Sequence, residues 1–277
     1  MLNRVILLLG DTPASVVARQ YAFRLIRAEG AEIAGLCGVD LAFIQAPMLG
    51  GIGTTAWKVH MEEALKAQAA TSRSRLHEAY EKECLANQVP CEWLEFEGDP
   101  TQALLRAAES ADLLISGHDT AFHGNIREFL PEMIANVLWT APRPVIVTAD
   151  ADHGDAAVMI AYDGSLPAVR AVQLFALLGI WSRHRMHLVT VQADKAEADG
   201  IAQGALRYLR LRGCNVDLIA VATRASPAEV LRIEVADRGI GTLVIGAYGH
   251  RGLRERMLGS VTTRLLQEPP CALFVYH

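Results

Sequence analysis

The sequence predicts an α/β protein made of two tandem doubly wound, Rossmann-like domains, each a five-stranded parallel sheet with helices on both faces. Three observations predict this class. Short apolar runs alternate with longer amphipathic runs, which is typical of parallel strands covered by helices on both faces. The order of these runs repeats once along the chain. Both copies also place a matching cap sequence before their third helix.

In the first copy, short apolar runs alternate with longer amphipathic runs from its beginning to its end. Its expected strands are residues 4–10, 31–39, 89–98, 112–117 and 144–148. Its expected helices are residues 14–30, 57–86, 100–109 and 126–138. The strands are short runs rich in Val, Ile and Leu, and the helices space their apolar residues three or four apart.

The second copy repeats this order. Its expected strands are residues 156–164, 186–192, 215–222, 242–246 and 271–276. Its expected helices are residues 167–178, a helix that ends at 204–212, and residues 227–237 and 261–267. The third helices open with Asp99-Pro100-Thr101-Gln102 and with Ser226-Pro227-Ala228-Glu229. Each offers a cap oxygen, then proline, then a side chain that reaches back to the cap amide.

This repeat indicates a tandem duplication. We expect a first domain over residues 1–149 and a second over 155–277, with the boundary in the small, acidic segment 148–157. The two domains should form an internal pseudo-dimer. Their last strands, 143–148 and 271–276, are expected to pair antiparallel, because an unpaired apolar edge invites aggregation.

Composition excludes several classes of protein. The chain has 277 residues, 51% hydrophobic and 21% charged, with a net charge of -5. The missing basic excess argues against nucleic acid as a partner. Asp11 and Pro13 end the first apolar run, and no run approaches the ~20 residues of a membrane helix. We therefore expect a cytoplasmic protein without a membrane partner. The five cysteines show no CxxC spacing, and we expect them to be reduced thiols.

The segment "GAYGHRGLRERMLGSVT", residues 246–262, lies between an expected strand and an expected helix. Such a loop lies over the carboxyl ends of parallel strands, where ligands bind. Its spaced glycines let the backbone approach a ligand, and the amides of residues 259–262 at the helix start attract an anion. Arg251, Arg254 and Arg256 add positive potential. The combination favours a phosphate group, although Ser260 as a simple N-cap, turn glycines and solvated arginines are the structural alternative.

Three segments of the sequence resemble a known protein family. The spacing Gly246-x-x-Gly249, nine residues, then Gly259-Ser260 resembles the nucleotide-binding signature of the universal stress protein family. "MIAYDGS" (159–165) resembles that family's first strand and turn, and "ADLLISG" (111–117) resembles its fourth strand in the other copy. Nearly the whole chain is thus similar to a tandem universal stress protein.

The resemblance implies a site for ATP, ADP or AMP, with or without Mg²⁺, in the second domain. Asp163 would lie near the ribose, although it also suits the cap of a helix. Val191 would offer backbone groups to the adenine edge. The remaining implied residues line the ribose and phosphates: Gly246, Ala247, Gly249, His250, Arg251, Gly259, Ser260 and Val261.

The first domain departs from the signature. No glycine occurs from Asn125 to His153, so Phe129, Leu130 or Pro131 falls where Gly-Ser should be. We therefore expect a degenerate motif and a non-nucleotide or empty site there, although Asp11 keeps the acid after the first strand. His118, Asp119 and His123 lack the spacing of a helical ligand pair, so we interpret them as a polar loop and expect no metal site.

These features predict a stress-response protein that binds an adenine nucleotide and acts as a nucleotide-dependent regulator of unknown protein partners. A slow ATPase or nucleotide hydrolase is the first alternative. Only Asp163 and His250 are candidate bases in the motif, so we expect no catalytic residue. A ligand-free structural or chaperone-like dimer is the second alternative, and a homodimer of the whole chain stays open.

Overall fold

The computed structural model describes residues 2–41, 54–122, 132–154, 156–247 and 258–277. Ten strands form one continuous sheet. The first-half strands are β1 (Arg4–Leu8), β2 (Glu32–Asp40), β3 (Cys91–Gly98), β4 (Leu113–Gly117) and β5 (Val145–Thr148). The second-half strands are β6 (Ala157–Ala161), β7 (Met186–Gln192), β8 (Val216–Ala222), β9 (Ile240–Gly246) and β10 (Ala272–Tyr276).

Helices cover both faces of this sheet. Those of the first half are α1 (Pro13–Glu29), α3 (Thr54–Asn87), α4 (Pro100–Ala108) and α5 (Glu132–Thr140). Those of the second half are α6 (Leu166–Leu178), α7 (Lys195–Leu211), α8 (Pro227–Arg238) and α9 (Ser260–Gln267). One apolar core lies under α1, α3, α6 and α7, and the other under α4, α5, α8 and α9. Each core contains residues of both halves.

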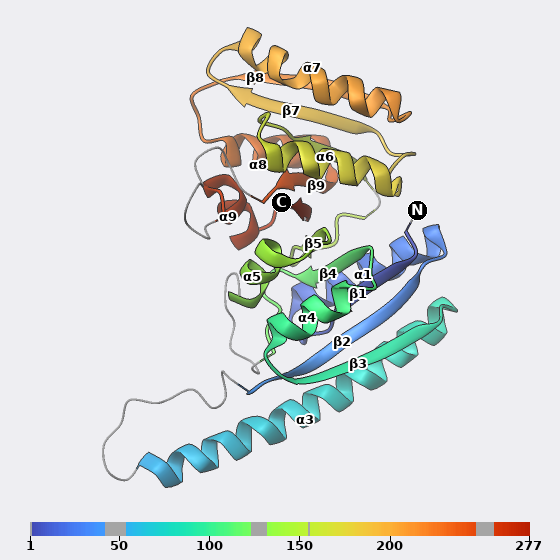
Figure 1. Ribbon diagram of the computed structural model, residues 1–277, viewed down its shortest axis with the longest axis vertical. Coiled ribbons are helices and arrows are strands. Elements are labelled where there is room, and N and C mark those ends of the chain that lie inside the picture. Colours follow the sequence, from blue (N-terminus) through green and yellow to red (C-terminus); the bar gives the residue numbers. More distant parts are fainter. Residues whose placement is uncertain (1, 42–53, 123–131, 155, 248–257) are drawn as a thin grey trace.

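The strand order is β3-β2-β1-β4-β5-β10-β9-β6-β7-β8. Each half therefore has the same doubly wound order, and the two halves meet at their last strands. Leu273 pairs with Val147 and Val275 with Val145 in an antiparallel ladder, whereas the other strand pairs are parallel. The predicted fold class and the predicted antiparallel junction are both confirmed. Figure 1 shows the halves one above the other, with β5 between them.

Local sequence explains where the helices begin. Thr12 caps α1 and accepts a hydrogen bond from the Ser15 amide, and Asp99 caps α4 through the amides of Thr101 and Gln102. Ser226 is the N-cap of α8, but its side chain makes no cap hydrogen bond. The two predicted cap sequences therefore occupy matching positions, and the first uses its side chain as the cap.

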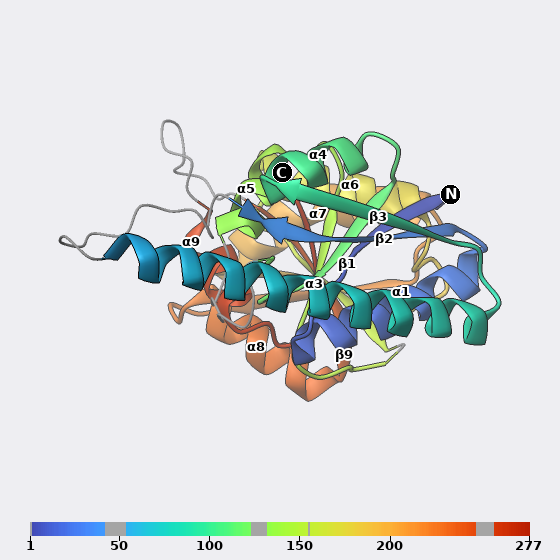
Figure 2. The ribbon, with the colours of Figure 1, turned by 90° about the horizontal axis from the view of Figure 1, so that it is seen from below.

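The longest helix is α3, with 34 residues. It runs along the first half, and its first turns project beyond the other helices (Figure 2). In the described ranges, no helix combines the length and the apolar character that a bilayer crossing needs.

The cysteines differ from the sequence-based expectation in one respect. Cys84, near the end of α3, and Cys91, the first residue of β3, form a disulfide with their Cα atoms 6.1 Å apart. Gln88 takes a positive φ of 56° between them and reverses the chain, so a separation of seven residues brings the thiols together. The expectation of five reduced thiols is therefore wrong for this pair. Cys37, Cys214 and Cys271 are free and buried.

Candidate functional site

A cavity of about 170 Å³ opens at the carboxyl ends of the second-half strands. In the sheet, β6 lies between β9 and β7. The chain leaves β6 toward β7 on one side, while β9 pairs with β6 on the other, so this is the point where the strand order reverses. Ligands of open α/β sheets bind at such points. The cavity is lined by Ala161, Tyr162, Asp163, Ser165, Ala168, Val189, Val191, Pro227, Leu231, Ile245, Gly246, Gly259, Ser260, Val261 and Thr262.

The turn after β6 fixes Asp163 at the mouth of this cavity. Asp163 Oδ1 accepts a 2.9 Å hydrogen bond from the Ser165 amide, and Gly164 between them has a φ of 78°. Ser165 in turn caps α6 by accepting from the Ala168 amide. The Asp163 side chain is exposed, and it raises the pKa of Tyr162 further after the larger effect of burial. The carboxylate therefore combines a structural role in the turn with access to the cavity.

Gly246 ends β9 under the first turn of α6. A Cβ built there would lie 2.7 Å from the Ala168 nitrogen and 2.8 Å from the Pro167 carbonyl carbon. The sequence suggested that this glycine admits a ligand or takes a positive φ. The structure gives another reason, because only glycine lets the helix backbone come so close to the strand.

The first residue of α9 is Ser260, and its N-cap is Gly259, which has no side chain to accept a bond. The prediction that Ser260 is the cap is therefore wrong by one position. The Gly259 amide donates to the Ala247 carbonyl at 3.3 Å, so it is occupied within the protein. The first helical bond is made by the Thr263 amide to Gly259, so the amides of residues 260–262 precede it and point out of the helix start.

A side-chain contact holds this helix start against the strand. Thr262 Oγ1 donates a 2.8 Å hydrogen bond to the Gly246 carbonyl. Thr262 is buried, whereas Ser260 is exposed and Val261 half-buried. The free amides are thus anchored at the edge of the cavity and lie at the positive end of the helix dipole, where an anion is favoured.

Strand β7 supplies peptide groups on the opposite side. The Tyr162 amide donates to the Val189 carbonyl, and the Thr223 amide donates to the Gln192 carbonyl. Successive residues of a strand turn their peptide groups to alternate neighbours. Val191 therefore turns its N–H and C=O toward the β6 side, beyond Ala161 where β6 ends. This position gives Val191 backbone groups that a ligand in the cavity can reach.

The structure brings most of the described candidate residues together. Those that line the cavity are Asp163, Val191, Gly246, Gly259, Ser260 and Val261. Ala247 is fully buried next to them and is not part of the lining. Gly249, His250 and Arg251 lie outside the described residues, as do Tyr248, Gly252, Arg254 and Arg256.

Sequence reasoning missed the apolar wall of the cavity. Val189, Ile245, Leu231 and Pro227 come from β7, β9 and α8, and all four line it. In the sequence they look like ordinary core residues. The alternating pattern of a strand does not show which of its apolar side chains borders a cavity at the end of the strand. The cap proline Pro227, at the start of α8, was the one local signal of this position.

The first half has a different cavity at the matching place. It measures about 230 Å³ and is lined by Leu9, Gly10, Asp11, Thr12, Pro13, Cys37, Gly38, Ala69, Ser72, Arg73, Leu76, Asp119, Ala121 and Phe122. Four of these come from α3, so this helix closes one side of the cavity. Burial raises the pKa of the Cys37 thiol to about 12, so the thiol stays neutral. Phe129, Leu130, Pro131 and His123 lie outside the described residues.

The acid after β1 does not match the acid after β6. Thr12 and Ser165 are the equivalent N-caps, and Asp163 lies two residues before its cap, where the first half has Gly10. A Cβ on Gly117 would meet Ala14 and Ser15, as one on Gly246 meets Pro167 and Ala168, which gives the same alignment. The expectation that Asp11 keeps this acid is therefore wrong by one residue. Asp11 instead pairs with Arg75 of α3, with 2.7 Å between the oxygen and Nη2.

Comparisons with known proteins place relatives beside this chain. A model of the universal stress protein family matches residues 156–277, the half that holds the first cavity described above. A universal stress protein of Synechocystis sp. is 28% identical over 143 residues, which cover 51% of this chain and 49% of that protein. The aligned region thus spans about half the length of this curated relative.

Solved structures match the fold over the full chain. A universal stress protein from Archaeoglobus fulgidus is 16% identical, with a TM-score of 0.71 over 100% of this chain and 98% of that one. A functionally unknown protein from Pseudomonas aeruginosa is 12% identical, with a TM-score of 0.58 over 99% of this chain and 92% of that one. At these identities, the matches show a shared architecture of two halves.

Proposed function

Since this chain belongs to the universal stress protein family through its C-terminal half, we propose that it binds ATP or a related adenine nucleotide there and acts as a nucleotide-dependent regulator. One observation carries the proposal. The amides at the start of α9, the Asp163 carboxylate and an apolar wall all line the same cavity. The phosphates of a nucleotide suit the amides, its ribose hydroxyls suit the carboxylate, and its flat base suits the apolar wall.

The phosphates would lie at the start of α9. The amides of residues 260–262 precede the first helical bond, and the helix dipole places positive potential there. Thr262 holds this end of the helix to Gly246, so the amides need little ordering when an anion arrives. Gly249, His250 and Arg251 belong to the proposed phosphate and ribose region through their place in the motif, and Mg²⁺ would accompany the phosphates.

The nucleoside would lie over the ends of β6 and β7. Val189 and Val191 offer an apolar surface to a flat base, and the outward peptide groups of Val191 can bond its edge. Asp163 can accept hydrogen bonds from ribose hydroxyls.

Regulation follows from binding without fast chemistry. Among the lining residues that the structure describes, Asp163 is the one charged group. Its proposed ribose contact leaves it away from the phosphates, where a base would have to activate water. The bound and free forms would then differ at the α9 surface, which a protein partner could distinguish.

We extend the proposal to a cytoplasmic location and to domains at 1–149 and 155–277. The buried free thiols Cys37, Cys214 and Cys271 suit a reducing compartment. The Cys84–Cys91 bond would be exposed to reduction there. Alkylation of the protein in intact cells, followed by mass spectrometry, would show in which state that pair exists.

The test is calorimetric titration of the full chain with ATP. We expect one site per chain, weakened at least tenfold in Asp163→Asn. Asp11→Asn is the matched control, because Asp11 follows the corresponding strand of the other half and pairs with Arg75. Two equivalent sites per chain, no binding, or equal effects of the two substitutions would refute the proposal.

A further inference from the structure

Three polar side chains meet at the carboxyl ends of β4 and β5 in the first half, away from the proposed nucleotide cavity. His118 and Asp119 directly follow β4, and Asp150 follows β5 by two residues. The strands are parallel neighbours paired through Gly117 and Thr148, so their ends leave the sheet at the same edge. The His118 amide also donates to the Thr148 carbonyl at 3.1 Å, which fixes the start of the loop.

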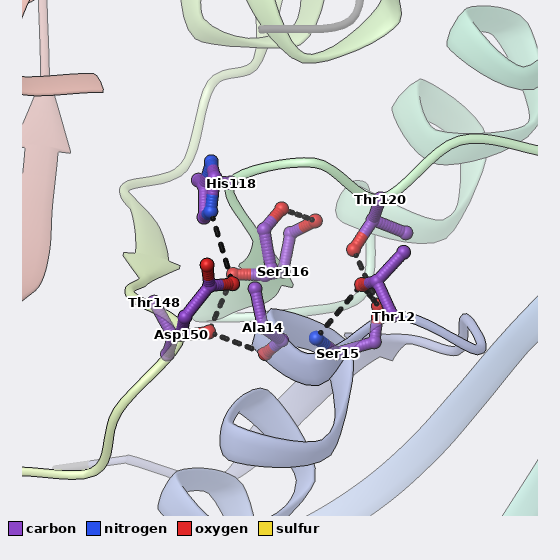
Figure 3. A network of polar contacts seen from close by, with 9 residues as sticks. Thr12, Ala14, Ser15, Ser116, His118, Thr120, Thr148 and Asp150 are labelled. Atoms are coloured by element: carbon purple, nitrogen blue, oxygen red, sulfur yellow. Dashed lines mark hydrogen bonds and ion pairs between the residues drawn. The ribbon is translucent and has the colours of Figure 1, made fainter. Parts of the chain in front are cut away.

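The side chains converge as well as the backbones. His118 Nε2 lies 3.3 Å from Asp150 Oδ1, and Figure 3 shows the two groups facing each other. One ligand atom from each of His118, Asp119 and Asp150 lies within 4.8 Å of the others. Ligand atoms held about 2.1 Å from a single ion lie roughly 3 to 4 Å apart. A small rotation of the side chains would therefore close the cluster around an ion.

Burial gives a second, independent observation. His118 is 7% exposed and Asp119 is 4% exposed, while Asp150 is exposed to solvent. His118 Nδ1 is buried and has no hydrogen-bond partner among the described residues. A buried ring nitrogen without a partner is rare and calls for a water molecule or a polar ligand beside the ring. The other nitrogen of the same ring, Nε2, is the one that faces Asp150 and would bind the ion, and Nδ1 would then donate to a water molecule.

We propose that His118, Asp119 and Asp150 bind a divalent transition-metal ion of the Mn²⁺, Fe²⁺ or Zn²⁺ class. One imidazole and two carboxylates are the mixed nitrogen and oxygen donors that these ions accept. Mg²⁺ and Ca²⁺ prefer oxygen donors alone and should bind more weakly. Three protein ligands leave coordination positions open to water or to a small molecule. Asp119 also lines the cavity of the first half, so the ion would lie beside that cavity.

The second half cannot form this site. The Ala247 amide donates to the Tyr276 carbonyl, as the His118 amide donates to Thr148, so Ala247 holds the place of His118. The site would therefore belong to the first half alone. The sequence favoured a polar loop at His118, Asp119 and His123, because the third ligand, Asp150, follows another strand and is distant along the chain.

The test uses Mn²⁺ and the nucleotide-free full chain, with electron paramagnetic resonance to measure the free aquo ion. We expect one Mn²⁺ per chain and at least a tenfold weaker affinity in Asp150→Asn. Asp150 is exposed, so this substitution should leave the fold intact. Asp237→Asn, an exposed residue of α8 in the other half, is the matched control and should bind as the wild type does.

Two further variants make the assignment specific. His118→Gln should lose affinity as Asp150→Asn does and should also lose the nitrogen coupling of the bound Mn²⁺ in pulsed spectra. Gly259→Val, which alters the nucleotide cavity, should bind Mn²⁺ with wild-type affinity. Wild-type binding weaker than about 1 mM, or wild-type affinity in Asp150→Asn, would overturn the proposal whatever the outcome of the ATP titrations.

Discussion

Tyr21 Oη lies 2.9 Å from Thr242 Oγ1, and this buried hydrogen bond joins α1 of the first half to β9 of the second. Burial raises the pKa of Tyr21 from 10.0 to about 12, against the smaller opposing effect of the Thr242 bond. The native state therefore favours the neutral phenol. This contribution to stability is complete below pH 10 and is lost as the pH rises from about 10 to about 12.

Tyr21→Phe tests this contact. At neutral pH the variant should be less stable by about 1 kcal/mol, because Thr242 loses its partner. Above pH 10 the wild type should lose stability that the variant keeps, so the difference in free energy of unfolding should shrink. Urea denaturation between pH 7 and pH 12 measures both effects. A constant difference over that range would contradict the assignment.

Gly246 and Gly117 should resist substitution by alanine for the same reason. The new Cβ would lie 2.7 Å from helix backbone in each case. We expect each variant to lose about 1 to 3 kcal/mol, since the helix must move off the strand. Gly200→Ala in α7 is the control, because nothing lies within 4 Å of its Cβ position, and it should gain up to about 1 kcal/mol. Equal thermal shifts in all three variants would refute the close approach.

Thr262→Val should loosen the start of α9. It removes the bond from Oγ1 to the Gly246 carbonyl and leaves that half-buried acceptor without it, at a cost of about 1 kcal/mol. Thr263→Val is the matched control, because its hydroxyl reaches the Leu258 carbonyl only at 3.5 Å. ATP affinity should fall with Thr262→Val and stay near wild type with Thr263→Val. Thermal unfolding and calorimetry would show whether the neighbouring threonines differ.

Gly259→Val should abolish ATP binding while the protein stays folded. Gly259 has a φ of -58° and a ψ of 146°, which valine can adopt, so the backbone needs no change. The added side chain would occupy the phosphate path at the helix start. Gly259→Ala should give an intermediate affinity, because its side chain is smaller. Calorimetric titration of the two variants measures this series, and unchanged affinity in Gly259→Val would place the phosphates elsewhere.

Turnover of ATP should stay below roughly one per second, the lower end of the usual enzyme range. Amides at a helix start bind the phosphates of the ground state and transition state alike, and such uniform binding does not raise the rate. His250→Ala should leave the affinity nearly intact. Phosphate release measured at saturating ATP is the test. Faster release that His250→Ala removes, with binding retained, would establish the hydrolase alternative.

Sequence periodicity was sufficient for the strands and for their pairing at the junction. "PVIVT" and "CALFVY" are too apolar to stay at an open edge, and each ends a copy of the repeat, so each was the natural partner of the other. The glycine spacing likewise located the cavity. The strand pairing was inferred from whole apolar strands, and the cavity from glycines close together in sequence. Both kinds of feature are visible in a sequence pattern.

The sequence could not predict contacts that change when the alignment of the two halves shifts by one residue. Asp11 and Asp163 look equivalent in sequence, yet the caps Thr12 and Ser165 show them to be offset by one position. Ser260 looked like a cap because serine favours that place, whereas the close approach of the chain to Ala247 puts Gly259 there. Cys84 and Cys91 meet only because Gln88 reverses the chain.

The pairing of β5 with β10 takes place within one chain, and this makes it independent of dilution. Two separate chains held by the same ladder would come apart as their concentration fell, and the stability of each would change with the amount of protein present. Here the connection between the halves keeps each at a fixed, high effective concentration for the other. One half is therefore a permanent support for its neighbour whatever ligand it binds, so the two sites are free to differ.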